Sequence, residues 1–335
     1  MLDFRSDTVT RPSDAMREAA RDAPVGDDVY AEDPTVNDLE TQAADILGMD
    51  DALFVPSGTM GNQVAARVHT ERGQEVLCER ESHVYKWELG GLAQHSALQV
   101  RPLDGDARGV LSPAQVEVGH VEADGHRPGT GLLCLENTHN SKGGTAIAPE
   151  RIDAAAEVAH DHGVPVHLDG ARLFNAAVAQ DVPAHRLAAN VESVMCCLSK
   201  GLGAPVGSVL AGSTEFIEAA RRVRKLFGGG MRQAGIVAAP GLLALANRER
   251  LAEDHRRASD LAAGLDGVEG LTAAEPETNI VLVETADTAD AFLDACEDED
   301  LLASKFGEDT VRFCTHLDVT DADVEAAIAA AQRAA

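Results

Sequence analysis

The sequence has few positive charges, and this restricts the partners that we expect for it. Its 335 residues include 28 basic and 56 acidic residues, for a formal net charge of −28. A surface with this excess of negative charge repels phosphate backbones and anionic lipid headgroups. We therefore expect neither nucleic acid nor a membrane as a partner.

Lysine is especially scarce, because most of the basic residues are arginines. The lysines are Lys86, Lys142, Lys200, Lys225 and Lys305. An acidic, lysine-poor composition suggests a protein from a halophile, since dense carboxylates keep a surface hydrated when the Debye length falls to about 3 Å in molar salt. An ordinary acidic protein is the alternative interpretation. In either case the charge concerns solubility and not catalysis.

Paired cysteine motifs and long apolar runs are also missing. None of the six cysteines forms a CxxC motif, so a redox or zinc site of that type is excluded. The N-terminus, MLDFRSDTVT, carries charges where a signal peptide has its apolar core, and no window approaches the roughly 18 apolar residues of a membrane span. These features predict a cytoplasmic protein.

Short apolar runs alternate with segments of helical character over the first 245 residues. The expected strands are 52–56, 75–79, 131–136, 164–169 and 193–199, and the clearest helices are 61–69 and 149–163. This alternation predicts an α/β fold with a mostly parallel sheet that is covered on both faces. Ligands of such folds bind at the carboxyl ends of the strands.

The pattern changes near residue 246, where an amphipathic helix at 247–267 leads to further short strands and a final helix at 321–335. We expect a large domain over residues 1–245, including an N-terminal arm, and a smaller α+β domain over residues 246–335.

Lys200 is the strongest candidate for chemistry. It follows the apolar strand at 193–199 and precedes GLGAPVG, a flexible turn that allows close approach. Partial burial lowers the pKa of an amine and makes it a better imine-forming nucleophile. A solvated charge at a strand end is the alternative, but the other four lysines lack this setting. The sequence therefore suggests that Lys200 binds pyridoxal 5′-phosphate.

Pyridoxal phosphate also needs an acid beside its pyridine nitrogen. Asp169 ends the strand at 164–169, so its carboxylate should reach the same edge of the sheet as Lys200. Arg172 lies three residues later and is suited to a carboxylate ligand, although a structural ion pair between Arg172 and Asp169 is an alternative.

A phosphate site is expected where a strand, a turn of small residues and a helix follow one another. Ser57, Gly58 and Thr59 form such a turn, although S-G-T turns are also common helix caps. GGGM at 228–231, between Lys225 and Arg232, is either a second phosphate contact or a mobile loop. No dinucleotide fingerprint is present, which argues against a Rossmann oxidoreductase.

Two of the twelve histidines are candidates for stacking or proton transfer. His83 follows the strand at 75–79 and should lie near the carboxyl edge, where an imidazole can stack on a pyridine ring. His126 lies in a polar loop before the strand at 131–136. A structural or surface role is the alternative for each of them.

These segments, taken in order, resemble the L-threonine aldolase family of fold-type I pyridoxal phosphate enzymes. The motifs include DFRSDTVTRPSDAMREA, FVPSGTMGNQ, LENTHN, VHLDGARLFNA, LSKGLGAPVGS and GGGMRQAG, and the likeness runs from end to end. The surroundings of His126, HRPGTG, are richer in glycine and proline than the family pattern.

The resemblance implies roles for particular positions. Lys200 would be the Schiff-base lysine, Asp169 the partner of the pyridine nitrogen and His83 the stacking ring. Residues 57–59 would bind the phosphate. The implied substrate-binding residues are Ser6, Tyr30, Arg172 and Arg312. Lys225 and Arg232 would reach the cofactor of a neighbouring subunit, and His126 would act on the β-hydroxyl group.

The resemblance further implies a homotetramer with active sites shared between subunits, and cleavage of L-threonine or L-allo-threonine to glycine and an aldehyde. It does not identify the ligands of any cation. Another reaction on the same scaffold, such as β-elimination or transamination, remains an alternative, as does a non-catalytic protein that kept the fold.

Overall fold

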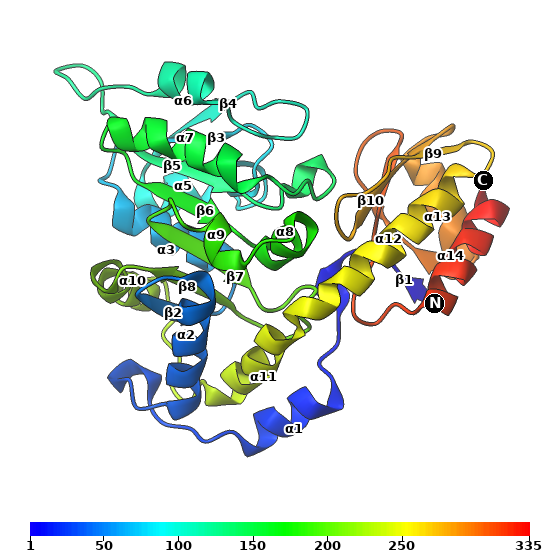
Figure 1. Cartoon of the computed structure of the whole chain (residues 1–335), viewed down its shortest axis with the longest axis horizontal. Coiled ribbons are helices and arrows are strands. Elements are labelled where there is room, and N and C mark those ends of the chain that lie inside the picture. Colours follow the sequence, from blue (N-terminus) through cyan, green and yellow to red (C-terminus); the bar gives the residue numbers. More distant parts are fainter.

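A seven-stranded sheet forms the centre of the larger part of the molecule, as the computed structural model of residues 1–335 shows (Figure 1). In spatial order its strands are β2 (Asp51–Val55), β8 (Ser208–Gly212), β7 (Ser193–Cys197), β6 (Val166–Asp169), β5 (Thr130–Glu136), β3 (Glu75–Glu79) and β4 (Gln99–Leu103). The strands from β7 to β4 run parallel, whereas β8 is antiparallel to both of its neighbours. Strand β2 therefore points in the same direction as β7, and its carboxyl end lies at the same edge.

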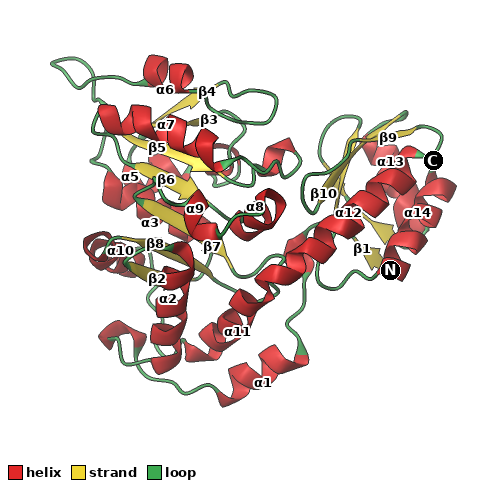
Figure 2. Ribbon diagram, in the orientation of Figure 1, coloured by secondary structure: helices red, strands yellow, loops and turns green.

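Helices cover both faces of this sheet (Figure 2). One face is covered by α3 (Gly58–His69), α4 (His83–Lys86), α5 (Gly91–Ser96) and α10 (Thr214–Leu226). The other is covered by α2 (Pro34–Leu47), α7 (Pro149–Asp161), α8 (Leu173–Gln180), α9 (Ala184–Leu187) and α11 (Gly235–Ala246). Burial on both faces explains why the central strands are continuous apolar runs in the sequence.

The predicted α/β fold with a mostly parallel sheet is confirmed, and each of the five expected strands is present. Strands β4 and β8 were not predicted. Strand β4 has the sequence QVRPL and lies at the edge of the sheet, where proline and arginine are tolerated. Strand β8, SVLAG, contains few large apolar residues.

The smaller part of the molecule has a four-stranded antiparallel sheet with its own apolar core. Its strands are β12 (Ser304–Lys305), β13 (Thr310–Cys314), β10 (Ile280–Thr285) and β9 (Leu271–Ala273), and its helices are α12 (Leu251–Asp266), α13 (Ala289–Asp298) and α14 (Asp321–Ala334). The N-terminal strand β1 (Leu2–Asp3) pairs with β11 (Leu301–Leu302) on this side, so the chain starts beside the small sheet and then crosses to the large one (Figure 1). The predicted boundary at 246 coincides with the end of α11 and stays a prediction.

The remaining elements are short or lie at the periphery. They are η1 (Asp7–Val9), α1 (Asp14–Asp22), η2 (Asp28–Tyr30), α6 (Pro113–Gly119), η3 (Asn140–Lys142) and η4 (Asn247–Arg250). None of the helices is both long and apolar enough to cross a membrane.

A buried ion pair joins the N-terminal arm to both parts of the molecule. The guanidinium group of Arg172 donates two hydrogen bonds to Asp7, each 2.7 Å long, and Asn279 donates to the same carboxylate over 3.2 Å. Burial raises the pKa of Asp7, but the charge and hydrogen bonds of Arg172 outweigh this effect and hold it well below its usual range. The alternative pairing of Arg172 with Asp169 does not occur, because Asp7 takes that place.

We predict that Asp7→Asn lowers the free energy of unfolding by about 3–5 kcal/mol, because it leaves the buried guanidinium group without a counter-charge. Urea unfolding at neutral pH measures the change. The matched control is Asp104→Asn, which breaks the solvent-exposed ion pair with Arg80 and should leave stability unchanged. Equal effects of the two substitutions would contradict the structural role of the Asp7–Arg172 pair.

Candidate active site

Four chain segments bring candidate residues to the carboxyl edge of the large sheet. Ser57 follows β2, His83 follows β3, Asp169 ends β6 and Lys200 follows β7. Strands β6 and β7 are neighbours in the sheet, so Asp169 and Lys200 lie at adjacent strand ends. The prediction that these positions share one edge of the sheet agrees with this arrangement.

The turn that carries Lys200 is anchored through its backbone. The carbonyl oxygen of Lys200 accepts hydrogen bonds from the Thr10 hydroxyl group at 3.0 Å and from the Gly203 N–H at 2.9 Å. Gly203 has a φ of +86°, which side chains rarely tolerate, so the glycine allows the chain to turn directly after the strand. The lysine side chain is half-buried.

Helix α3 begins at this edge. Ser57 is its N-cap and accepts a hydrogen bond from Met60 N–H, so the backbone N–H groups of the first turn point toward the site. A Cβ atom on Gly58 would lie 2.8 Å from Cys197 Sγ and 3.0 Å from Met195 Cε. The missing side chain therefore lets the start of α3 pack against β7.

Asp169 is a buried carboxylate without a cationic partner. It is 2% exposed, and its oxygens accept hydrogen bonds from Asn62 Nδ2 at 2.8 Å and from Ala171 N–H at 3.1 Å. Both donors are neutral. Because burying a charge is unfavourable unless it is paired, this position calls for a ligand that carries a positive charge.

His83 is oriented by a second carboxylate, Glu88, which the sequence analysis did not single out. His83 Nδ1 lies 2.9 Å from Glu88 Oε1, whose side chain is fully buried. Burial lowers the pKa of His83, but the hydrogen bond to Glu88 and the charges of Asp169 and Glu88 together raise it above its ordinary value. A proton on Nδ1 is held by Glu88, which leaves Nε2 for other contacts.

Arg172 and Arg312 are brought together from the two parts of the molecule. Both donate to the amide oxygen of Asn140, Arg172 over 3.1 Å and Arg312 over 3.4 Å. Arg312 also donates to the backbone carbonyl of Arg5 at 3.0 Å, next to Ser6. Asn140 and Asp7 were missed in the sequence, although both lie in polar runs that the family motifs include.

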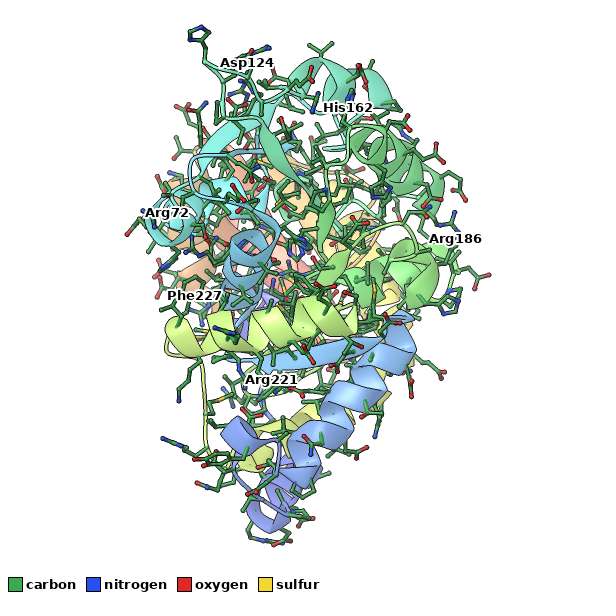
Figure 3. All side chains as sticks on the ribbon, turned by 90° about the vertical axis from the view of Figure 1, so that its left-hand side faces the viewer. Arg72, Asp124, His162, Arg186, Arg221 and Phe227 are labelled. Atoms are coloured by element: carbon green, nitrogen blue, oxygen red, sulfur yellow. The ribbon has the colours of Figure 1, made fainter.

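His126 is not brought to this edge within the chain. His126 is exposed in the loop that precedes β5, on the opposite edge from Asp169. The seven residues of β5 span roughly 20 Å. Figure 3 shows the neighbouring Asp124 on the part of this loop that projects from the domain.

Tyr30, Lys225 and Arg232 lie on three segments that contact one another near the carboxyl end of β2, and none of their side chains forms a hydrogen bond with Lys200. Tyr30 ends η2 and is 72% exposed. Lys225 is in the last turn of α10, and Arg232 pairs with Asp27 at 3.3 Å while remaining largely exposed. Their side chains are therefore free to contact another molecule.

One group of side chains has the composition of a metal site. Ligand atoms of His83, Glu88 and Asp169 lie within 4.8 Å of one another. The amide of Asn62 already bridges the two carboxylates, with 2.8 Å to each, and Glu88 already binds the imidazole. We therefore assign the group to a hydrogen-bond network.

The donor groups of this edge fit pyridoxal phosphate. The first turn of α3 offers N–H groups and hydroxyls for a phosphate. Lys200 offers an amine, and the unpaired charge of Asp169 suits a protonated pyridine nitrogen. His83 offers a flat ring, and the two arginines suit an amino acid carboxylate.

Comparisons with known proteins agree with this chemistry. A family model described as "Beta-eliminating lyase" matches residues 3–288. Low-specificity L-threonine aldolase 1 of Arabidopsis thaliana is 42% identical over 99% of this chain and 96% of its own length. Low specificity L-threonine aldolase of Escherichia coli K12 is 43% identical over 96% of this chain and 95% of its own.

A solved structure of Leishmania major threonine aldolase has the same fold, with a TM-score of 0.85, 20% identity and 99% of each chain covered. The structure of Thermus thermophilus aspartate aminotransferase matches with a TM-score of 0.73, 17% identity and coverage of 100% of this chain and 96% of its own. The predicted fold-type I architecture is confirmed. The chain belongs to the beta-eliminating lyase family and, within it, to the low-specificity L-threonine aldolases.

Proposed function

We propose that this protein is a pyridoxal phosphate-dependent lyase that cleaves L-threonine and L-allo-threonine to glycine and acetaldehyde. The observation that carries the proposal is the buried, unpaired carboxylate of Asp169 at the strand end next to Lys200. Membership of the L-threonine aldolases supports the choice of substrate. Pyridoxal phosphate, when bound, supplies an aldehyde that condenses with amines and a ring that accepts the electron pair of a broken bond.

The residues of the chain then have distinct tasks. Lys200 would contribute the amine that binds the aldehyde of the cofactor. Asp169 would accept a hydrogen bond from a protonated ring nitrogen and so favour the electron-accepting form of the ring. Residues 57–59 hold the phosphate through backbone N–H groups and hydroxyls.

Arg172 and Arg312 would orient the substrate. Arg172 has Nε and Nη2 engaged by Asp7, which leaves Nη1 directed to Asn140 and the site. Together with Arg312, and with Ser6 beside it, this group would hold the substrate carboxylate. The position of the carboxylate would decide which bond at Cα is cleaved, and so would favour cleavage of Cα–Cβ over loss of the carboxylate.

The proton of the β-hydroxyl group must be removed as the bond breaks. We propose His83 Nε2 as the base, because Glu88 fixes the proton of His83 on Nδ1. His126 is the second candidate. Since it lies at the opposite edge of its own sheet, it would have to act in the site of a neighbouring subunit.

The family model also names β-elimination, so product analysis is the first experiment. We expect L-threonine and L-allo-threonine to yield equal amounts of glycine and acetaldehyde, and Lys200→Ala to abolish this activity by at least about a thousandfold. Lys305→Ala, which removes a half-exposed lysine paired with Asp290, is the matched control and should keep full activity. Formation of 2-oxobutyrate and ammonia instead of glycine would favour elimination and contradict the aldolase.

The pH profile tests the assignment of His83. Glu88 raises the pKa of His83, and a base acts only when it is unprotonated, so activity should rise with pH through that raised pKa. Glu88→Gln removes the charge, lowers the pKa of His83 and moves the acidic limb to lower pH. The amide of Gln63, whose oxygen has no hydrogen-bond partner, can turn to accept from the new side chain.

The control for this experiment is Glu81→Gln, which changes a carboxylate in the same segment that pairs with Lys86. It should leave the profile of kcat/KM against pH where it is. An acidic limb that does not move in Glu88→Gln would exclude His83 as the group that titrates.

We further propose a homotetramer in which Arg232, Lys225 and Tyr30 complete the site of a neighbouring subunit. Their exposure supports this, as does the exposure of Leu226 and Ile236 on the same segments, at 70% and 52%.

A cytoplasmic location is supported by six buried free cysteines. Adaptation to high salt stays a prediction from composition.

Subunit mixing tests the shared site. Lys200→Ala and Arg232→Ala should each be inactive or nearly so, whereas the two chains produced together should recover activity, because one site of each mixed pair then has both native residues. No recovery, with mixed oligomers verified by mass, would place Arg232 in the site of its own chain.

A further inference from the structure

A continuous chain of buried hydrogen bonds leads from Asp169 to the far end of helix α3. Asp169 Oδ2 binds Asn62 Nδ2 at 2.8 Å, and Asn62 Oδ1 lies 3.0 Å from His167 Nε2. His167 Nδ1 lies 2.8 Å from Ser193 Oγ, which in turn lies 2.8 Å from His69 Nε2. Apart from His69, which is partly exposed, the linking side chains are at most 1% exposed.

The two carboxylates that accept from Asn62, those of Asp169 and Glu88, determine which atom donates in each of these hydrogen bonds. Asn62 Nδ2 lies 2.8 Å from both Asp169 and Glu88, so both of its hydrogens are donated to carboxylates. The amide cannot be reversed without placing its oxygen against two negative charges. Asn62 Oδ1 must therefore accept, and His167 Nε2 must carry a hydrogen.

The remaining bonds follow from the neutrality of the two imidazoles. Burial lowers the pKa of His167 to about 3 and that of His69 to about 4, so both rings are neutral at physiological pH. His167 Nδ1 is then an acceptor, and the Ser193 hydroxyl donates to it. Ser193 Oγ in turn accepts from His69 Nε2–H. Every hydrogen in the chain points toward Asp169.

Two elements of secondary structure build this arrangement. Asn62 and His69 are seven residues apart on α3, which places them on one face of the helix about 10 Å apart. His167 on β6 is the register partner of Ser193 on β7, and it shares a sheet face with Asp169 two residues later. The ring of His69 is stacked on Phe216 of α10, with centroids 4.6 Å apart.

We propose that Asn62, His167, Ser193 and His69 are positioning residues that hold Asp169 as an anion directed at the cofactor's ring nitrogen. The proposal rests on the function proposed above, since it requires a protonated pyridine as the partner of Asp169. Aligned dipoles strengthen one another in a low-dielectric interior, so each donor along the chain stabilises the negative charge at its end. None of the four residues needs to touch the substrate.

Cofactor affinity in the absence of substrate tests the proposal. Ser193→Ala removes the central donor and should weaken pyridoxal phosphate binding by the full protein about fivefold, the effect of one hydrogen bond. The analogue with a C–H group in place of the ring nitrogen makes no hydrogen bond to Asp169. Its affinity should therefore be the same for the native protein and the variant.

The matched control is Ser208→Ala, which removes another fully buried hydroxyl of the same sheet, one that contacts Cys197 Sγ. Ser208→Ala should change neither the affinity for pyridoxal phosphate nor the affinity for the analogue. An equal loss for cofactor and analogue in Ser193→Ala would indicate a merely structural role and overturn the proposal, as would no loss for either. Failure of the native protein to bind pyridoxal phosphate would instead contradict the proposed function.

The donor in each of these hydrogen bonds can be identified without substituting Asn62, His167 or Ser193. Nitrogen-15 NMR of the native chain at neutral pH should find His69 and His167 neutral, each with its hydrogen on Nε2. His69→Phe keeps the aromatic stack on α10, identifies the His69 signal, and should weaken cofactor binding less than Ser193→Ala does. A hydrogen on Nδ1 of His167 would overturn the proposal.

Discussion

The charge of Asp169 is the constraint on which the site depends. A carboxylate at 2% exposure with only neutral donors is costly to bury, and the protein lowers this cost through Asn62 and the hydrogen bonds behind it. The part of this cost that remains favours a ligand that carries a positive charge. The same constraint explains why Glu88, a second buried carboxylate, shares the amide of Asn62 and turns its other oxygen toward Gln63.

The arginines proposed to bind the substrate are held by a different kind of contact, one that joins the two parts of the molecule. Arg172 belongs to the large part, Arg312 to the small one, and Asn140 contacts both. Asp7 on the N-terminal arm holds Arg172 in place. A change in the relative position of the two parts would therefore separate the guanidinium groups and alter the space in which a carboxylate can bind.

Much of the fold was predictable because parallel strands buried on both faces produce apolar runs that the sequence displays directly. The candidates at strand ends, Lys200, Asp169 and His83, followed from the rule that parallel strands end at one edge. Residues that act through partners far along the chain were not predictable in this way. Asp7 and Arg172 are 165 positions apart, and Asn62 and Asp169 are 107 apart, so neither pairing leaves a local pattern.

The histidines also show that contacts between distant parts of the chain could not be predicted from the sequence. The sequence drew attention to His83 and His126 because of their neighbours, whereas His167 lies unremarked within the strand sequence VPVHLD. The contacts that distinguish His167 are made with Ser193, its register partner on β7, and with Asn62 on α3. The position of His126 before a strand was visible in the sequence, and the structure adds that the strand runs parallel to β6, so that His126 lies at the edge opposite Asp169.

Gly58 gives the start of α3 its close contact with β7, since a Cβ atom at this position would require Cys197 or Met195 to shift. The helix acts as a rigid rod about 18 Å long, with the phosphate turn at one end, Asn62 within its first two turns and His69 at the other end. The helix itself fixes the distance between its first turn and Asn62, and its packing on β7 sets where both lie relative to Asp169. Substitution of this glycine would alter the spacing of the whole site at once, even though its own atoms carry no charge and donate no side-chain bond.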